Sequence, residues 1–380
     1  MRFIHISDLH LGKRVNEFSM LEDQKYILER ILEIIDDNKV ECVLIAGDVY
    51  DRSVPQADAV LLFDDFLTSM AKKNISVCVI SGNHDSPERL SFGSRLMKGE
   101  NIYISPLFMG VEKPVELNDK NGKINVYMIP FIKPGVVRHV YNEADIESYN
   151  EAFQYVAGQI KINREERNIL MAHQFVTGAG KGGSEDISVG GLDNVDLCAF
   201  DGFDYVALGH IHNSQTVGRE TVRYCGTPLK YSVSESGQEK SVIMIDMEEK
   251  GNIAISKIPL KPLRDLRCIK GTYMEVTSRD FYKGTNTEDY IHITLTDKED
   301  IPDAIGKLRV IYPNIISMDY KGRRRYDGES VDGDGIEKME AKTPLELLQE
   351  FYRFQRGESM SEEQINFADS IVKKIWEENI

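Results

Sequence analysis

The sequence predicts an α/β protein built on two β-sheets with helices packed against them. Three observations support this fold class. Five short apolar runs lie between residues 3 and 209, each run is followed by polar side chains, and helical segments separate the first three runs. Strands that alternate with helices are typical of parallel sheets in α/β folds. Polar side chains gathered at strand ends also fit such a sheet, because ligands bind at the carboxyl ends of its strands.

The totals indicate a globular protein of more than one domain. At 380 residues the chain exceeds one average domain, and we expect two or three. Its 41% hydrophobic and 28% charged residues are ordinary for a soluble protein. We expect a cytoplasmic protein without membrane contact, because no apolar run approaches roughly 20 residues and Met1 leads directly into a strand. The five scattered cysteines indicate reduced thiols rather than disulfides or a zinc site.

The net charge of −16 argues against a nucleic-acid partner without excluding one. Much of the negative charge lies beyond Asp327, and divalent ions bound to a carboxylate-rich site would cancel more of it.

The first part of the chain predicts a βαβαβ unit. Apolar residues between Leu21 and Ile35 recur at helical spacing, and a second helix is expected after Pro55, which suits a first helical position. The three runs that end before Asp8, Asp48 and Asn83 would then be parallel strands.

A second sheet is expected further along. Asn121-Gly122 between two strand-like runs indicates a hairpin, and a helix is expected near 144–164. We expect strands near 223–225 and 241–246 to complete this second sheet.

The rest of the chain predicts smaller units beyond a first domain at 1–260. Strand-like runs at 266–276, 290–295 and 315–320 around one helix predict a small α+β domain at 265–325. The acidic, glycine-rich segment 327–342 is typical of a linker. Two capping boxes, Thr343 with Glu346 and Ser361 with Gln364, predict a helical hairpin at 343–380, with Gly357 at the end of the first helix. This hairpin could pack on its own chain or dock on a partner.

The strand ends together predict a dinuclear metal site. Divalent ions that act on phosphoryl groups need oxygen and imidazole ligands, with one carboxylate shared between two ions. Any one of these histidines alone would more often be structural, but five of the eight histidines in the chain follow a strand end in these motifs. The candidate residues are Asp8, His10, Asp48, Asn83, His84, His173, His210 and His212, and Asp85 is expected to support the ligands rather than to be one.

These motifs, in this order, resemble the calcineurin-like metallophosphoesterase superfamily. The flanking residues are similar to its bacterial DNA-repair branch, the SbcD family of nuclease subunits, over nearly the whole chain. The motifs that carry the resemblance are Ser7-Asp8-Leu9-His10-Leu11-Gly12, Gly47-Asp48-Val49-Tyr50-Asp51, Gly82-Asn83-His84-Asp85-Ser86-Pro87-Glu88-Arg89-Leu90 and Gly226-Thr227-Pro228-Leu229-Lys230-Tyr231-Ser232.

The resemblance implies a metallophosphoesterase sandwich of two mixed β-sheets flanked by helices, with a small α+β cap and a C-terminal helical hairpin. It implies two divalent metal ions, most often manganese. One ion would be bound by Asp8, His10 and His212, and the other by Asn83, His173 and His210, with Asp48 bridging them. His84 would not be a ligand but would stabilise or protonate the leaving oxygen.

The activity implied is that of a manganese-dependent DNA nuclease in repair, recombination and replication, both a double-strand exonuclease and a single-strand or hairpin endonuclease. The partners implied are DNA and a coiled-coil ATPase of the SbcC type, bound through residues 343–378 and acting with a homodimer of this chain in a heterotetramer. The alternatives are a metallophosphoesterase that acts on a protein phosphate or a nucleotide, and a scaffold subunit without catalysis.

Several residues have two interpretations. The Asp51 carboxylate either orients His84 or pairs with Arg52 in a loop. His5 alternates with apolar neighbours and is interpreted as structural, and no role is predicted for His139 or His292.

Two further segments carry weaker signals. The loop at 177–184 fails the spacing of a phosphate-binding Walker loop, so no ATP site is predicted. Lys321, Arg89 and the basic residues 323–325 either contact DNA phosphates or are simply solvated.

Overall fold

The protein is described by a computed structural model. It covers residues 1–105, 107–111, 113–142, 145–180, 194–321, 344–356 and 359–377. The chain forms two compact units, Met1–Arg267 and Cys268–Ile380. The finer division into cap, linker and hairpin stays a prediction, and the predicted linker at 327–342 lies outside the described residues.

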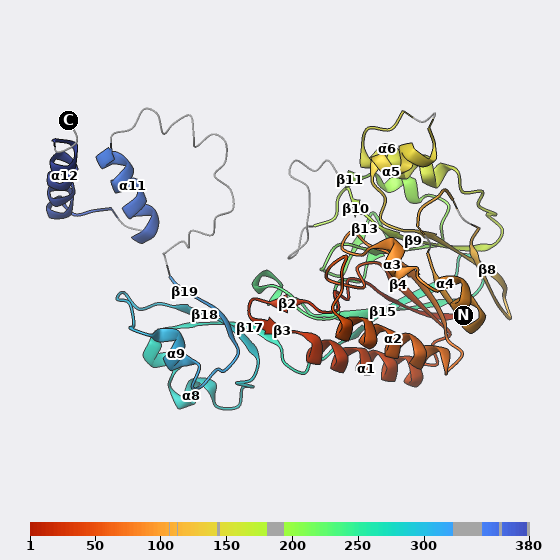
Figure 1. Cartoon of the computed structure of the whole chain (residues 1–380). Helices are drawn as coiled ribbons and strands as arrows, with labels where there is room; N and C mark the ends of the chain where they lie inside the picture. The colour runs from red at the N-terminus through yellow and green to blue at the C-terminus, as the bar shows by residue number, and fades with distance from the viewer. Residues whose placement is uncertain are drawn as a thin grey trace. The chain divides into compact units, whose positions relative to one another are not determined.

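The first unit contains a mixed six-stranded sheet that includes the predicted βαβαβ unit (Figure 1). Strands β1, β4, β5 and β6 are parallel, and β15 and β16 extend the sheet antiparallel beside β1. In sheet order the strands are β16 (Ile253–Pro259), β15 (Ser241–Met247), β1 (Arg2–Ile6), β4 (Cys42–Ala46), β5 (Ser76–Ile80) and β6 (Ile102–Ile104). The predicted helices α1 (Leu21–Asp37) and α2 (Ala57–Ala71) connect the first three parallel strands, and α2 packs on β5.

A second mixed six-stranded sheet lies against the first. Its four central strands β14, β12, β9 and β8 are parallel, and β13 and β7 are antiparallel at the edges. In sheet order the strands are β13 (Gln215–Val217), β14 (Arg219–Tyr224), β12 (Tyr205–Gly209), β9 (Arg167–His173), β8 (Gly122–Ile129) and β7 (Val115–Asp119). The predicted hairpin is confirmed, with Asp119 paired to Gly122.

Two hydrophobic clusters explain the layers. Phe3 and Leu44 of the first sheet pack with Met171 and Ala207 of the second in one buried cluster between the sheets. The opposite face of the second sheet packs on α5 (Pro134–Val140) and α6 (Tyr149–Gly158) in another. The predicted α/β class is therefore confirmed as a sandwich of two mixed sheets with helices outside.

Two element predictions were wrong in detail. β15 belongs to the first sheet rather than the second, because it pairs with β1. Its side chains are buried on both faces, so its sequence suits either sheet. The helix expected at 144–164 is only α6, because Ser148 and Glu151 form a capping box that starts it at Tyr149.

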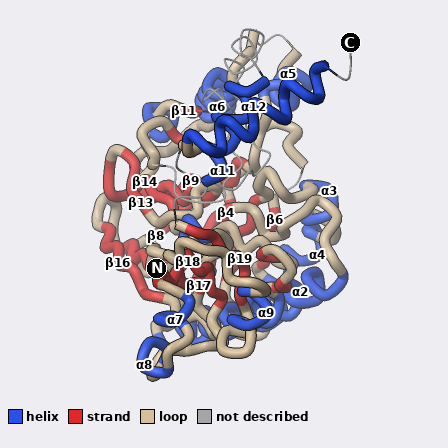
Figure 2. The backbone as a smooth tube through the Cα atoms, turned by 90° about the vertical axis from the view of Figure 1, so that its left-hand side faces the viewer, coloured by secondary structure: helices blue, strands red, loops and turns tan. Residues whose placement is uncertain are grey.

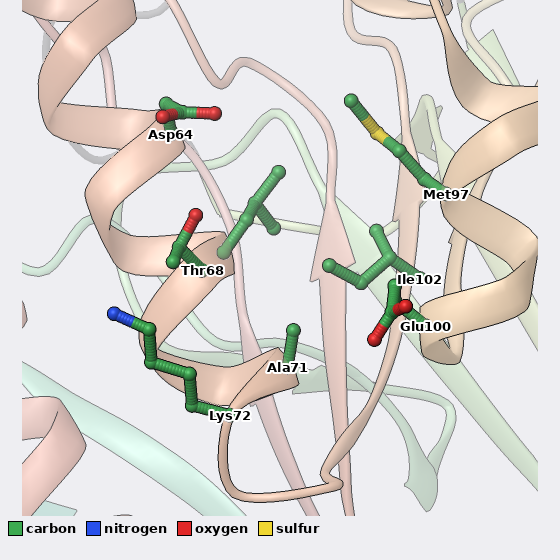
Figure 3. A pocket seen from close by; sticks show the side chains of 8 residues that line it. Asp64, Thr68, Ala71, Lys72, Met97, Glu100 and Ile102 are labelled. Atoms are coloured by element: carbon green, nitrogen blue, oxygen red, sulfur yellow. The ribbon is translucent and has the colours of Figure 1, made fainter.

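Short elements complete the first unit. They are β2 (Arg14–Val15), β3 (Phe18–Ser19), α3 (Pro87–Leu90), α4 (Ser94–Met97), η1 (Lys98–Glu100), β10 (Phe175–Val176), β11 (Asn194–Val195), η2 (Leu197–Phe200) and η3 (Val233–Glu235). A pocket of about 350 Å³ lies between α2 and the segment from α4 to β6, where Thr68 and Ala71 face Met97 and Ile102 (Figure 3). None of the predicted site residues lines it.

The second unit has a three-stranded sheet in the order β17 (Leu266–Gly271), β18 (Tyr290–Leu295) and β19 (Ile315–Tyr320). The predicted strand at 266–276 is shorter because Thr272 and Glu275 form a capping box that starts α7 (Tyr273–Val276). Its remaining short helices are α8 (Arg279–Tyr282) and α9 (Ala304–Leu308).

The predicted terminal hairpin is present as α11 (Pro344–Arg356) and α12 (Glu362–Glu377), which lie side by side (Figures 1 and 2). Gln364 Nε2 donates to the Tyr352 hydroxyl at 3.1 Å between them. Ser361 and Gln364 form the predicted second capping box. Thr343 and Gly357, assigned to the ends of the first helix, lie outside the described residues. In the part of the chain that the structure describes, no helix is both long and apolar enough to span a membrane.

Candidate metal centre

All of the predicted ligands lie at the carboxyl ends of five strands. Asp8 and His10 follow β1, Asp48 follows β4, and Asn83 follows β5 in the first sheet. His173 ends β9, and His210 and His212 follow β12 in the second sheet. Because the two sheets pack face to face, these strand ends meet at one edge of the sandwich.

One group consists of Asp8, His10 and His212, whose candidate ligand atoms lie within 4.8 Å of one another. The Nε2 atoms of His10 and His212 are 3.1 Å apart. All three residues are buried. A carboxylate and two imidazoles on one point suit a divalent transition-metal ion.

A second group forms around Asn83. Its Oδ1 atom lies 3.0 Å from His173 Nε2 and 3.0 Å from His210 Nδ1. Asp48 Oδ2 lies 3.3 Å from His173 Nε2 and 3.8 Å from His10 Nε2, so this carboxylate stands between the two groups. The arrangement fits two cations that share one carboxylate.

The loops that present these ligands have unusual backbone conformations. The φ angles of Asp8, His10, Asp48 and His210 are 53°, 45°, 50° and 102°, although none is glycine. Such left-handed residues cost of order 1–3 kcal/mol each and persist where the surrounding structure holds them. Two main-chain hydrogen bonds hold the loops together: Asp8 N donates to the Gly47 carbonyl and His10 N to the Asp48 carbonyl, both at 3.0 Å.

Two glycines allow the strand ends to approach one another. A Cβ on Gly82 would lie 2.7 Å from Asp48 Cγ and 2.5 Å from the Asp48 amide nitrogen. A Cβ on Gly209 would lie 2.7 Å from His173 Nδ1. At Gly82 the close approach to Asp48 is the reason for glycine.

Burial and charge set the protonation of the group. Burial lowers the pKa of His10 well below its usual value and that of His210 to about 3, so both are neutral, as ligands must be. Burial raises the pKa of Asp8 to about 6. Burial also opposes charge on His173 and Asp48, but their mutual attraction outweighs it, raising the pKa of His173 to about 9 and lowering that of Asp48.

Neighbouring polar groups orient the histidines. His173 Nδ1 lies 2.8 Å from the Ala46 carbonyl oxygen, which can only accept, so Nδ1 keeps its proton and Nε2 is the nitrogen that would lose a proton to bind a metal. His212 Nδ1 lies 3.3 Å from the buried carboxylate of Glu235, which has the same effect. Glu235 keeps its charge: burial raises its pKa, but His212 and Lys240 lower it to about 2.

Other buried side chains hold the loops, and sequence reasoning missed most of them. Gln24 of α1 donates to the His10 carbonyl at 2.7 Å, and the Tyr231 hydroxyl donates to the Leu9 carbonyl at 2.5 Å. The Asp85 carboxylate accepts from the amides of Gly82, Val49 and Tyr50, which agrees with its prediction as a supporting residue rather than a ligand. Tyr231 lies in one of the family motifs, but nothing in the sequence marks Gln24 or Glu235.

His84 lies beside the two groups. Its amide donates to Asp48 Oδ1 at 2.9 Å, and its Nδ1 lies 3.1 Å from the carbonyl oxygen of Asp51. Its ring could also reach a metal with His10 and Asp48, since their candidate atoms lie within 4.8 Å.

The Asp51 carboxylate lies 2.8 Å from Lys13 Nζ and 3.8 Å from His10 Nδ1. The structure places His84 Nδ1 against the Asp51 main chain, and an orienting role for the Asp51 carboxylate stays a prediction. Arg52, the alternative partner, is 3.7 Å away from it.

The remaining candidates lie elsewhere or are not described. His5 is buried between the sheets with Nδ1 3.0 Å from the Tyr205 hydroxyl, as a structural histidine would be. His139 lies at the end of α5, and His292 Nδ1 is 2.7 Å from Ser317 Oγ in the second unit. Residues 181–184 of the predicted loop and the basic residues 323–325 lie outside the described residues.

Comparisons with known proteins agree with this geometry. Residues 1–214 match the calcineurin-like phosphoesterase family, and residues 262–356 match the family of the type 5 capsule protein repressor C-terminal domain. The SbcD subunit of the nuclease SbcCD from Staphylococcus epidermidis is 31% identical over 369 residues, which are 96% of this chain and 96% of that protein.

Similar solved structures include a dimetal phosphatase from Danio rerio, with 12% identity, 69% of this chain and 98% of that chain covered, and a TM-score of 0.43. Another, from Thermus thermophilus, has 11% identity, covers 67% of this chain and 98% of that chain, and gives a TM-score of 0.38. The two family matches and the near full-length identity carry the assignment. The chain is a metal-dependent phosphodiesterase and belongs, within the calcineurin-like phosphoesterases, to the SbcD family of nuclease subunits.

Proposed function

We propose that the chain is the nuclease of an SbcCD-type complex and hydrolyses DNA phosphodiester bonds with two divalent ions, with manganese as the expected metal. The observation that carries the proposal is the pair of ligand groups that share Asp48. The relative that matches over 96% of the chain is named a nuclease, and this supports DNA rather than a protein phosphate as substrate. The expected reactions are exonuclease cleavage of double strands and endonuclease cleavage of single strands and hairpins.

The residues divide the work as follows. Asp8, His10 and His212 hold one ion, Asn83, His173 and His210 hold the other, and Asp48 bridges them. Two such ions supply Lewis acidity to a phosphodiester and favour deprotonation of the attacking water. The neutral amide of Asn83 limits the negative charge at the site, so the ions keep their attraction for phosphate.

His84 acts as the proton donor to the leaving oxygen in this proposal. The Asp51 carbonyl can only accept, so Nδ1 of His84 carries a proton and fixes the ring. The opposite nitrogen, Nε2, is then the atom that carries the proton to the leaving group. General acid catalysis of this kind contributes typically 10²- to 10⁴-fold in rate.

The terminal hairpin is the proposed binding element for the SbcC-type ATPase. Four large apolar side chains of α11 and α12 are exposed, with Phe351 56% and Phe367 68% exposed, and Leu348 and Ile371 beside them in the two helices. Apolar side chains left in water at this density mark protein-binding surfaces. Deletion of residues 344–377 should abolish co-purification with the cognate ATPase; a stable complex after deletion would refute this part. A homodimer of the chain remains part of the proposal.

The test of function uses the full chain with its cognate ATPase, Mn²⁺, hairpin-ended duplex DNA and p-nitrophenyl phosphate. Wild type should cleave the DNA, EDTA should stop cleavage, and Asp48→Asn should reduce it by at least about 10²-fold, because a bridging carboxylate is lost. Asp58→Asn, at an exposed position of α2, is the matched control and should cleave normally. Turnover of the small phosphate with DNA left intact would favour the alternative, a phosphatase for protein phosphates or nucleotides.

A further inference from the structure

A buried carboxylate lies directly behind one of the candidate metal ligands. Glu235, at the end of η3, is fully buried, and its Oε1 atom is 3.3 Å from His212 Nδ1. The Nε2 atom of the same ring faces His10 in the metal centre. The carboxylate, the imidazole and the metal position therefore follow one another in a line of contacts. Carboxylates in this position fix the orientation of a ligand histidine and make it a stronger ligand.

Glu235 does not stand alone, because a buried lysine holds its other oxygen. Lys240 Nζ lies 2.7 Å from Glu235 Oε2, and both side chains are at most 6% exposed. The same ammonium donates to the main-chain carbonyl of His212 at 3.0 Å and to Thr227 Oγ1 at 2.7 Å. Lys240 thus binds both the carboxylate and the backbone of the histidine that the carboxylate contacts.

The second ligand group has no comparable support in the described residues around His173. That ring is oriented by a neutral carbonyl, Ala46 O, at 2.8 Å. The two groups therefore differ in charge: one contains Asp8 and has a carboxylate behind His212, and the other contains the neutral Asn83 and has a carbonyl behind His173. A buried ion pair is costly to desolvate, and well-packed apolar residues often replace one without loss of stability. Its place directly behind one candidate ligand points to a task beyond stability.

We propose that Glu235 and Lys240 are positioning residues that hold His212 as a strong ligand, so that the Asp8–His10–His212 group binds its metal ion more tightly than the Asn83–His173–His210 group. This inference rests on the proposed role of His212 as a ligand. Loss of the carboxylate at the outer shell of a metal typically costs 10- to 100-fold in metal affinity.

The experiment measures Mn²⁺ binding to the full chain by titration calorimetry, for wild type, Glu235→Gln and Glu235→Ala. Wild type should bind two ions with different affinities. Glu235→Gln keeps an oxygen that can accept from His212 but loses the charge, and the affinity of the tighter ion should fall about 10-fold. Glu235→Ala loses both, and the fall should reach about 100-fold.

Asp119→Asn is the matched control for a purely structural effect. Asp119 is also a buried carboxylate in an ion pair, 2.5 Å from Arg167 Nη2 with side chains 8% and 3% exposed, but it belongs to β7 and contacts none of the candidate ligands. It should lose thermal stability in EDTA and keep both manganese affinities. Melting in EDTA also reports whether each Glu235 variant is folded, and Glu235→Gln decides the test if Glu235→Ala does not fold.

The outcomes separate the inference from the function it rests on. A wild type that binds no manganese would overturn the metal centre itself. If wild type and both Glu235 variants each bound two ions, and the variants had the same manganese affinities as wild type, the positioning role alone would be overturned. An equal loss of affinity in Asp119→Asn would also overturn it, because the effect would then follow from any lost ion pair.

Discussion

The sharpest prediction concerns Gly82, where one added methyl group should displace the carboxylate of Asp48, the proposed bridge between the two ions. The Cβ of an alanine would lie 2.5 Å from the Asp48 amide nitrogen and 2.7 Å from Asp48 Cγ. Real Cβ contacts essentially never fall below 3.0 Å, so Asp48 has to shift by roughly 0.5–1 Å. The backbone of Gly82 does not need a positive φ, and the effect is therefore steric. A misplacement of about 1 Å at a catalytic centre costs on the order of 10²-fold in rate.

The assay compares manganese-dependent DNA cleavage by wild type, Gly82→Ala and Gly237→Ala under single-turnover conditions. Gly237 is the matched control, because its added Cβ would meet nothing within 4 Å. We expect a loss of about 10²-fold for Gly82→Ala and normal cleavage for Gly237→Ala. If Gly82→Ala cleaved DNA at the wild-type rate, Asp48 would not need the position seen in the structure, and the bridging role would fail.

Three further predictions follow from charge and packing. Asp119→Asn should lower the free energy of unfolding by about 3 kcal/mol at pH 7, measured in urea, because it leaves Arg167 buried without its carboxylate. Arg167 holds the pKa of Asp119 well below its usual value, so this ion pair stabilises the fold above about pH 4, and its contribution is lost as the pH falls further. The free energy of unfolding of Asp119→Asn should therefore fall less in acid than that of wild type. Parallel curves of unfolding free energy against pH would contradict this. Burial lowers the pKa of His173, but the charge of Asp48 outweighs this and raises that pKa to about 9. Manganese binding at pH 7.5 should therefore release a proton from His173, and the heat of binding measured by calorimetry should depend on the buffer. Equal heats in all buffers would count against this. Gly209→Ala should weaken manganese binding, since its Cβ would clash with the Ala46 carbonyl oxygen that contacts His173 and would lie 2.7 Å from His173 Nδ1; unchanged binding would show that His173 tolerates displacement.

The strand ends were predictable because their signal is local. An apolar run predicts a strand, and the polar residue that follows it, such as Asp8, Asp48 or His173, is then predicted to lie at the end of that strand. The parallel order of β1, β4 and β5 could be predicted because parallel strands need a crossover connection, and the intervening helices supply it. From these two facts the site could be assembled before any distance was known.

The supporting residues were not predictable because their signal is not local. Glu235 and Gln24 have no pattern that separates them from exposed polar residues, and only the packing of distant segments buries them at the centre. The Asp51 carboxylate faces Lys13 because the loop turns its carbonyl toward His84, and such a choice depends on backbone geometry. β15 was assigned to the wrong sheet because both of its faces are buried, and its sequence therefore does not show which strand it pairs with.

The most direct test of the central claim is a paired measurement on His84→Ala. The full chain, wild type and variant, is loaded with Mn²⁺, the bound metal is counted, and cleavage of hairpin-ended duplex DNA is followed with the cognate ATPase present. We expect two ions per chain in both proteins and a loss of about 10²- to 10⁴-fold in cleavage by the variant. Loss of an ion from the variant would make His84 a ligand, and full cleavage by the variant would remove it from the chemistry.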